Sequence, residues 1–126
     1  MSWNPPKYRF RDLEVWQLGM KIVHEAYALI KKFPSDERFG LADQFRRAAV
    51  SIVLNIVEGS GQPTNKGFIV YIFRSRASLL ECVACLDIAL QEKFVTEKDA
   101  ATLSVLLQEE YFKLTALAKS IEAKKS

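Results

Sequence analysis

Residues 44–61, QFRRAAVSIVLNIVEGSG, are the most informative stretch of this 126-residue chain. Apolar residues recur in and beside it at spacings of three and four, which predicts an amphipathic helix with two apolar stripes. The first stripe consists of Leu41, Phe45, Ala48, Ile52 and Asn55, and the second of Val50, Val53, Leu54 and Val57. A helix that is apolar on most sides must be buried on most sides. Because so short a chain has few elements to cover it, the stretch predicts self-association.

The same spacing predicts three further helices, so that four are expected at about residues 12–32, 36–59 or 61, 65–92 and 96–121. Asp12 and Thr96 are the expected N-caps of the first and last helices. The predicted core seam of the first helix is Leu13, Trp16, Met20, Val23, Tyr27 and Ile30. The predicted seam of the third is Phe68, Ile72, Ser75, Leu79, Cys82, Leu86 and Ala89, with a second apolar stripe beside it.

Connections of about four or five residues place neighbouring helices antiparallel. We therefore expect an all-α fold, an up-down-up-down antiparallel four-helix bundle. It should form one domain over residues 1–126, in which residues 1–11, with Pro5 and Pro6, make an extended arm.

The composition excludes several classes of protein. The longest apolar run, residues 48–57, is well short of the ~20 residues that span a membrane. Residues 1–12 hold no apolar signal region followed by a cleavage site, so a cytoplasmic location is expected. Cys82 and Cys85 lie inside a helical pattern without a second ligand pair, and His24 is the only histidine. We therefore predict that both cysteines pack in the core, and that the chain has no metal and no cofactor.

Polar residues interrupt the apolar seams at Asn55 and Glu110. With Glu58 one turn after Asn55 and Glu81 in the middle of the third helix, we predict a structural polar network of Asn55, Glu58 and Glu81, with Arg47 or Arg76 as a further partner. A catalytic interpretation remains open, because two carboxylates in one cleft, Glu58 and Glu81, could perform acid–base chemistry.

The basic residues are unevenly distributed along the predicted bundle. The end that gathers residues 1–16, 55–70 and 117–126 has seven basic and four acidic residues, and the opposite end, residues 27–43 and 87–102, has five basic and seven acidic. Arginine is preferred for bidentate recognition of phosphate. The candidate nucleic-acid-binding residues are Arg46, Arg47, Arg74, Arg76, Arg9, Arg11 and Lys66.

Four motifs in the first half of the chain identify a resemblance. They are F-x-D-L-x-V-W-Q at residues 10–17, F-P-x-x-E-x-F-G-L at 33–41, Q-x-R-R-A-A-x-S-I at 44–52 and N-I-x-E-G-x-G at 55–61. The sequence resembles the four-helix bundle proteins encoded in intervening sequences of 23S ribosomal RNA genes. The resemblance implies a homopentamer without enzymatic activity. It also suggests kinship with the accessory variability determinant of diversity-generating retroelements, a basic pentamer that associates with a reverse transcriptase and nucleic acid.

The sequence thus predicts a non-enzymatic, self-assembling scaffold that binds RNA, DNA or a nucleoprotein through its basic surface and does not bind a membrane. One alternative is a protein–protein adaptor that uses its apolar surface and has no nucleic-acid role. A less favoured alternative is a hydrolase or nuclease that uses Glu58 and Glu81. The residues predicted to form the oligomer interface are Val50, Val53, Leu54, Val57, Ile69, Phe73 and Leu80.

Overall fold

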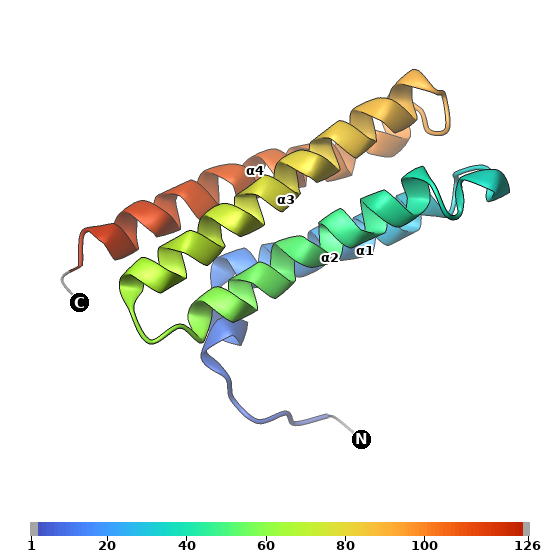
Figure 1. The fold of residues 1–126 in the computed structure, drawn as a ribbon. Helices are drawn as coiled ribbons and strands as arrows, with labels where there is room; N and C mark the ends of the chain where they lie inside the picture. The colour runs from blue at the N-terminus through green and yellow to red at the C-terminus, as the bar shows by residue number, and fades with distance from the viewer. Residues whose placement is uncertain (1–2, 125–126) are drawn as a thin grey trace.

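The computed structural model describes residues 3–124. Its long helices are α1 (Glu14–Ile30), α2 (Leu41–Ser60), α3 (Asn65–Gln91) and α4 (Glu97–Glu122), and they run alternately up and down (Figure 1). Two 3₁₀ helices, η1 (Arg9–Asp12) and η2 (Ser35–Glu37), precede α1 and α2. Each long helix packs against two others, in the cyclic order α1, α2, α3, α4. The chain is therefore an all-α, antiparallel four-helix bundle, as the sequence predicts.

The helix ends follow local chemistry. Thr96 and Asp99 form a reciprocal capping box at the start of α4, which confirms that prediction. Asp12 does not cap α1: it ends η1, and Leu13 occupies the N-cap without a side-chain hydrogen bond. The helix predicted after Ser35 begins only at Leu41, because η2 and Gly40 intervene. Residues 9–11, predicted as part of the extended arm, are the first part of η1. Residues 1, 2, 125 and 126, which the predicted domain includes, lie outside the described range.

The core agrees with the predicted seams of α2 and α3 but not with that of α1. Every residue of the predicted α3 seam is buried, as are Phe45, Ala48 and Ile52 on α2. On α1 the buried residues are Val15, Leu18, Gly19, Ile22, Ala26, Leu29 and Ile30. Of the predicted seam, Ile30 is buried, Leu13, Trp16 and Val23 are half-buried along the flank of α1, and Met20 and Tyr27 are 44% and 42% exposed. The large apolar side chains on this flank led to the prediction of a core seam, whereas α1 makes its close contact with Val53 of α2 through Gly19.

Two glycines set close helix contacts. A Cβ atom at Gly19 would lie 2.7 Å from Cγ1 of Val53, and one at Gly59 would lie 2.9 Å from both Cδ1 of Phe68 and Cβ of Tyr71. These positions bring α1 and α3 against α2. Among the helices that the structure describes, none is long and apolar enough to cross a membrane.

Candidate nucleic-acid interface

Two arginine–aromatic stacks lie beside the close contact at Gly59. Phe68 and Tyr71 of α3 pack against this glycine near the end of α2. The guanidinium carbon of Arg9 lies 5.2 Å from the centre of the Phe68 ring, and that of Arg74 lies 4.7 Å from the Tyr71 ring. Stacking on a ring face orients a guanidinium while leaving its N–H groups available for other acceptors. The glycine therefore positions two rings, and each ring positions a cation.

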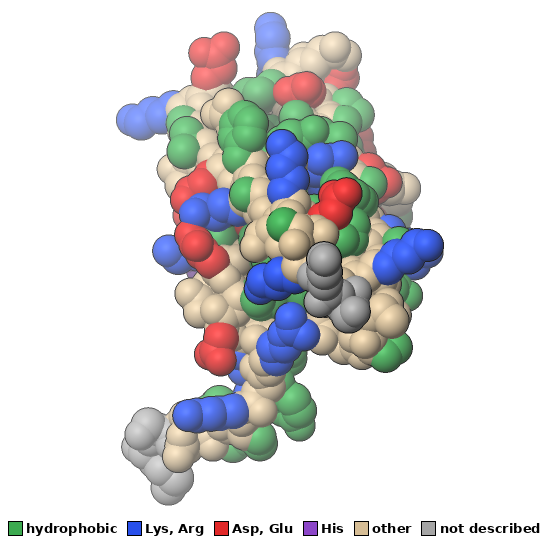
Figure 2. Space-filling model, turned by 90° about the vertical axis from the view of Figure 1, so that its left-hand side faces the viewer, with side chains coloured by type: hydrophobic (Ala, Val, Ile, Leu, Met, Phe, Trp, Pro, Cys, Tyr) green, Lys and Arg blue, Asp and Glu red, His purple; other side chains and the backbone are tan. Residues whose placement is uncertain are grey.

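Further basic residues belong to the same end of the bundle. Lys66 is exposed in the first turn of α3, and Lys119 is exposed in the last turn of α4. Figure 2 shows this end of the molecule, with Lys and Arg side chains on the arm and around the ends of the helices. Within residues 3–124, Arg9, Arg11, Lys66 and Arg74 make no ion pair. We call Arg9, Arg11, Lys66 and Arg74 the basic end.

The other candidate arginines do not join the basic end. Arg46 and Arg47 both form ion pairs with Asp43, at 3.6 Å and 3.0 Å, so one carboxylate offsets part of their charge. Arg76 lies between the rings of Phe73 and Tyr111, at 4.6 Å and 5.2 Å, and donates a hydrogen bond to Oγ1 of Thr115. Arg76 thus links α3 to α4, and its guanidinium has partners within its own chain. The seven predicted residues therefore do not form one continuous surface.

The predicted interface residues separate into two faces and a core position. Val50 and Leu54 border a hollow beside Tyr27 of α1, whereas Leu80 lines a groove between α3 and α4. Leu54, Phe73 and Leu80 are 56%, 43% and 51% exposed, and Val50, Val57 and Ile69 are half-buried. Val53 is buried against Gly19 and belongs to the core of its own subunit. The prediction that Val53 remains available to a neighbour is wrong, because α1 crosses α2 at that point.

The predicted polar network does not form. Asn55 donates to the carbonyl oxygen and to Oγ of Ser51, at 2.9 Å and 3.0 Å, while Glu58 and Glu81 are both exposed. Neither carboxylate forms an ion pair within residues 3–124. Glu110 is fully buried as predicted, and burial raises the pKa of its carboxyl group to about 8.

Serine hydroxyls supply the polar contacts that the sequence analysis missed. Oγ of Ser51 and Oγ of Ser78 are 2.7 Å apart, and Ser75 donates a hydrogen bond to the carbonyl oxygen of Ile52 at 2.7 Å. Ser75 lies on the predicted seam of α3, and this position was the sequence signal that could have indicated a buried hydroxyl contact. A small hydroxyl at a seam position can bond a facing backbone where helices approach closely.

The register of α2 and α3 separates Glu58 from Glu81. The Ser51–Ser78 contact fixes the level of these antiparallel helices. Glu58 is seven residues beyond Ser51 in one direction and Glu81 three residues beyond Ser78 in the other. At 1.5 Å per residue they are about 15 Å apart along the bundle. They share no cleft, so the two-carboxylate interpretation fails on geometry.

The remaining candidate groups for catalysis also lie apart. Cys82 and Cys85 are buried free thiols, as predicted, and burial raises the pKa of Cys82 to about 12. His24 is exposed on α1 beside Thr102 and Leu106 of α4, away from both cysteines on α3. Within the described residues, no group of three or more His, Cys, Asp or Glu could hold a metal ion.

Comparison with known proteins gives the family. The model of the 23S rRNA-intervening sequence protein family matches residues 11–116. A crystal structure from Bacteroides thetaiotaomicron, described as a protein with unknown function from the S23 ribosomal protein family, is similar in fold. It has a TM-score of 0.77 at 18% identity and covers 83% of this chain and 98% of its own. No curated protein matches. The family model matches most of the chain and the four antiparallel helices agree with the similar fold, so the chain belongs to the 23S rRNA-intervening sequence protein family.

Proposed function

We propose that this protein is a non-enzymatic subunit of a homo-oligomeric ring, a pentamer by family resemblance, that binds nucleic acid through the basic end of each subunit. The observation that carries the proposal is that Arg9 and Arg74 stack on Phe68 and Tyr71 and form no ion pair within residues 3–124.

Cyclic symmetry strengthens the electrostatic argument. All subunits of a cyclic ring point the same way along its axis, so their basic ends lie on one rim. Repeated positive charge on a rim attracts a polyanion without reading its sequence. A single subunit has a net charge of only +3. Assembly places the basic ends of several subunits on one rim, and this increases the positive electrostatic potential there.

The two apolar faces fit the same assembly. A head-to-tail ring needs two different surfaces that bind each other, whereas a two-fold dimer uses one surface twice. Leu54 with Val50 provides one apolar face on α2, and Leu80 with Phe73 provides another on α3. Their separation on the subunit supports a ring over a two-fold pair.

Nucleic-acid binding is tested by the salt dependence of affinity for a labelled single-stranded RNA of mixed sequence. The variant Arg9→Gln/Arg74→Gln should bind more weakly and reduce the steepness of log K against log salt by about 0.7 per lost contact, the value for a single strand. The matched control Arg46→Gln/Arg47→Gln removes the same charge beside Asp43 and should leave the slope nearly unchanged. Equal slopes for both variants, or no binding by the native protein at low salt, would refute the binding role and favour the adaptor alternative.

Assembly is tested separately by sedimentation equilibrium. The native protein should be a multimer at micromolar concentration, and Leu54→Glu should dissociate it without loss of helical circular dichroism, because Leu54 is exposed in the subunit. Val53→Glu should instead unfold the subunit, since that side chain is buried. A monomeric native protein would contradict the ring.

A further inference from the structure

Basic and aromatic side chains alternate where the N-terminal arm joins the bundle. The alternating residues are Lys7, Tyr8, Arg9, Phe10 and Arg11. Tyr8 is 56% exposed, and Trp3, farther out on the arm, is 81% exposed. The arm leads away from the bundle (Figure 1), so both rings are open to water. Exposed rings that alternate with cations are the combination on which single-stranded nucleic acids bind, because bases stack on the rings and phosphates pair with the cations.

The ring of Tyr8 is held in a fixed place. Its centre lies 6.2 Å from that of Phe10, and the two ring planes are inclined by only 23°. The guanidinium carbon of Arg11 lies 5.2 Å and 5.5 Å from the same two ring centres, and Arg11 donates a hydrogen bond to the carbonyl oxygen of Pro6. Phe10 in turn packs edge-on against Trp16 of α1, with 4.7 Å between the ring centres. A ring that is fixed in this way loses little conformational entropy when a base stacks on it.

The cations of this segment have charge available for phosphates. Lys7, Arg9 and Arg11 form no ion pair within residues 3–124. Two adjacent prolines, Pro5 and Pro6, favour the polyproline II conformation, in which the five residues from Trp3 to Tyr8 span about 16 Å at 3.1 Å each. The two rings are therefore too far apart to hold one base between them. Each ring has room for a base of its own, with Lys7 between them in the sequence.

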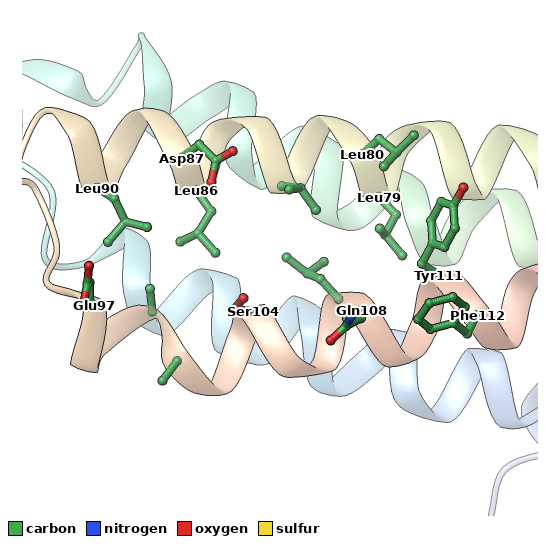
Figure 3. Close-up of a pocket in the computed structure, with 14 residues that line it drawn as sticks. Leu79, Leu80, Leu86, Asp87, Leu90, Glu97, Ser104, Gln108, Tyr111 and Phe112 are labelled. Atoms are coloured by element: carbon green, nitrogen blue, oxygen red, sulfur yellow. The ribbon is translucent and has the colours of Figure 1, made fainter.

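The groove between α3 and α4 has the opposite charge and is not a place for a polyanion. It has a volume of about 600 Å³. Asp87 lies on its α3 side and Glu97 on its α4 side, around a space into which leucines point (Figure 3). Among the described residues that line the groove there is no lysine or arginine. Repulsion by the two carboxylates therefore directs a nucleic-acid strand to the arm and the basic end.

We propose that the arm binds unpaired bases of a single-stranded nucleic acid, with one base stacked on Tyr8 and another on Trp3. The proposal rests on the nucleic-acid binding proposed above and names the class of strand. Inside a duplex, neighbouring base pairs cover both faces of each base, so the two rings have nothing to stack on. Phosphate contacts alone favour the opposite order, because a duplex carries one charge per about 1.7 Å and a single strand one per about 3.4 Å. The order of the two affinities therefore distinguishes stacking from charge attraction.

The first test compares one labelled RNA, of mixed sequence and without self-complementarity, as a free strand and annealed to its complement at the same salt concentration. The native protein should bind the free strand at least about fivefold more tightly, the lower end of the range for stacking on one ring. Trp3→Ala and Tyr8→Ala should each weaken binding of the free strand by about fivefold or more. Neither variant removes a charge, so the salt dependence should stay as in the native protein.

A matched control tests whether any exposed ring beside an arginine would serve. Phe39, which precedes α2, is 86% exposed, and the guanidinium carbon of Arg38 lies 5.4 Å from its ring centre. Phe39→Ala should leave the affinity for the free strand unchanged. Trp3→Phe retains a ring and should weaken binding less than Trp3→Ala does.

Tryptophan fluorescence tests the contact itself. The chain has two tryptophans, Trp3 and Trp16. The saturating free strand should quench the emission of the native protein, and Trp3→Phe should remove most of this quenching. Equal or tighter binding of the duplex, with unchanged Trp3 emission, would overturn the stacking contact while leaving phosphate binding by the basic end intact. Equal weakening of both RNA forms by Trp3→Ala would also overturn the preference for a single strand. No binding of either form at low salt would overturn this proposal together with the proposed function.

Discussion

Replacing Glu110 with glutamine should remove a large pH dependence from the stability of the bundle. Glu110 is 0% exposed, and neither of its carboxyl oxygens has a hydrogen-bond partner within residues 3–124. Burial raises the pKa of this group from 4.5 to about 8; nearby Lys113 lowers it in part, and Glu109 and Glu14 raise it. The side chain is therefore mostly a neutral acid at pH 7 in the folded protein.

The sign and size of the effect follow from proton linkage. Between pH 4.5 and pH 8 the folded chain holds a proton on Glu110 that the unfolded chain releases, so the free energy of unfolding falls as the pH rises. The contribution of the neutral acid is complete below pH 4.5 and is lost by about pH 8. At about 1.4 kcal/mol per pH unit, the loss is about 3 kcal/mol by pH 7 and about 4 kcal/mol by pH 8, where the folded group is half ionised. Glu110→Gln has no proton to release and should not show this decline.

The measurement is urea unfolding followed by far-ultraviolet circular dichroism at pH 5, 6, 7 and 8, at one protein concentration. The difference in unfolding free energy between Glu110→Gln and the native protein should grow steadily in favour of the variant. Glu81→Gln makes the same substitution at an exposed position that forms no ion pair within residues 3–124, and it should follow the native pH profile. A constant difference between Glu110→Gln and the native protein across this range would refute the reasoning.

Three further changes test individual contacts by equilibrium unfolding. Gly59→Ala should destabilise the subunit by about 1–3 kcal/mol, because the new Cβ atom would lie 2.9 Å from Phe68 and Tyr71; an unchanged midpoint would contradict that close contact. Lys93→Gly should stabilise the protein by about 1 kcal/mol, because Lys93 holds a φ of 62° in the turn that ends α3; a loss of stability would refute it. Arg76→Met should lower the free energy of unfolding by about 1–2 kcal/mol, because the contacts with two aromatic rings and with Thr115 are lost. The salt dependence of RNA binding should stay unchanged. A weaker salt dependence would show that Arg76 contacts the RNA.

The fold could be predicted because helix periodicity and stop signals act locally. The α3 seam and the Thr96 capping box depend on residues a few positions apart, and both are present as predicted. The prediction of the α1 seam was mostly wrong because two apolar stripes run side by side on that helix. Which stripe faces inward depends on the partner helix, and the close approach at Gly19 favours the stripe with smaller side chains.

The candidate site could be predicted in composition but not in arrangement. The excess of basic residues at one end can be read from the sequence, and the pairing of Asp43 with Arg46 and Arg47 was also predictable, because these residues are three and four positions apart on one helix. Arg74 and Tyr71 are three residues apart on α3, whereas the sequence could not reveal the stack of Arg9 on Phe68, because these residues are far apart in the chain. Such contacts depend on tertiary packing, which hydrophobic periodicity does not encode.

The hydroxyl contacts between α2 and α3 have a consequence for the order of folding. Four residues, 61–64, join these helices, and the Ser51–Ser78 and Ser75–Ile52 bonds tie together residues 27 and 23 apart across that turn. Closing a short loop loses little chain entropy, so local hairpins form early in the folding of helical proteins. The α2–α3 hairpin is thus the natural nucleus, onto which α1 and α4 add later. A nascent chain that has emerged only to residue 91 already contains that nucleus, with the exposed faces of α2 and α3 on its surface before the subunit is complete.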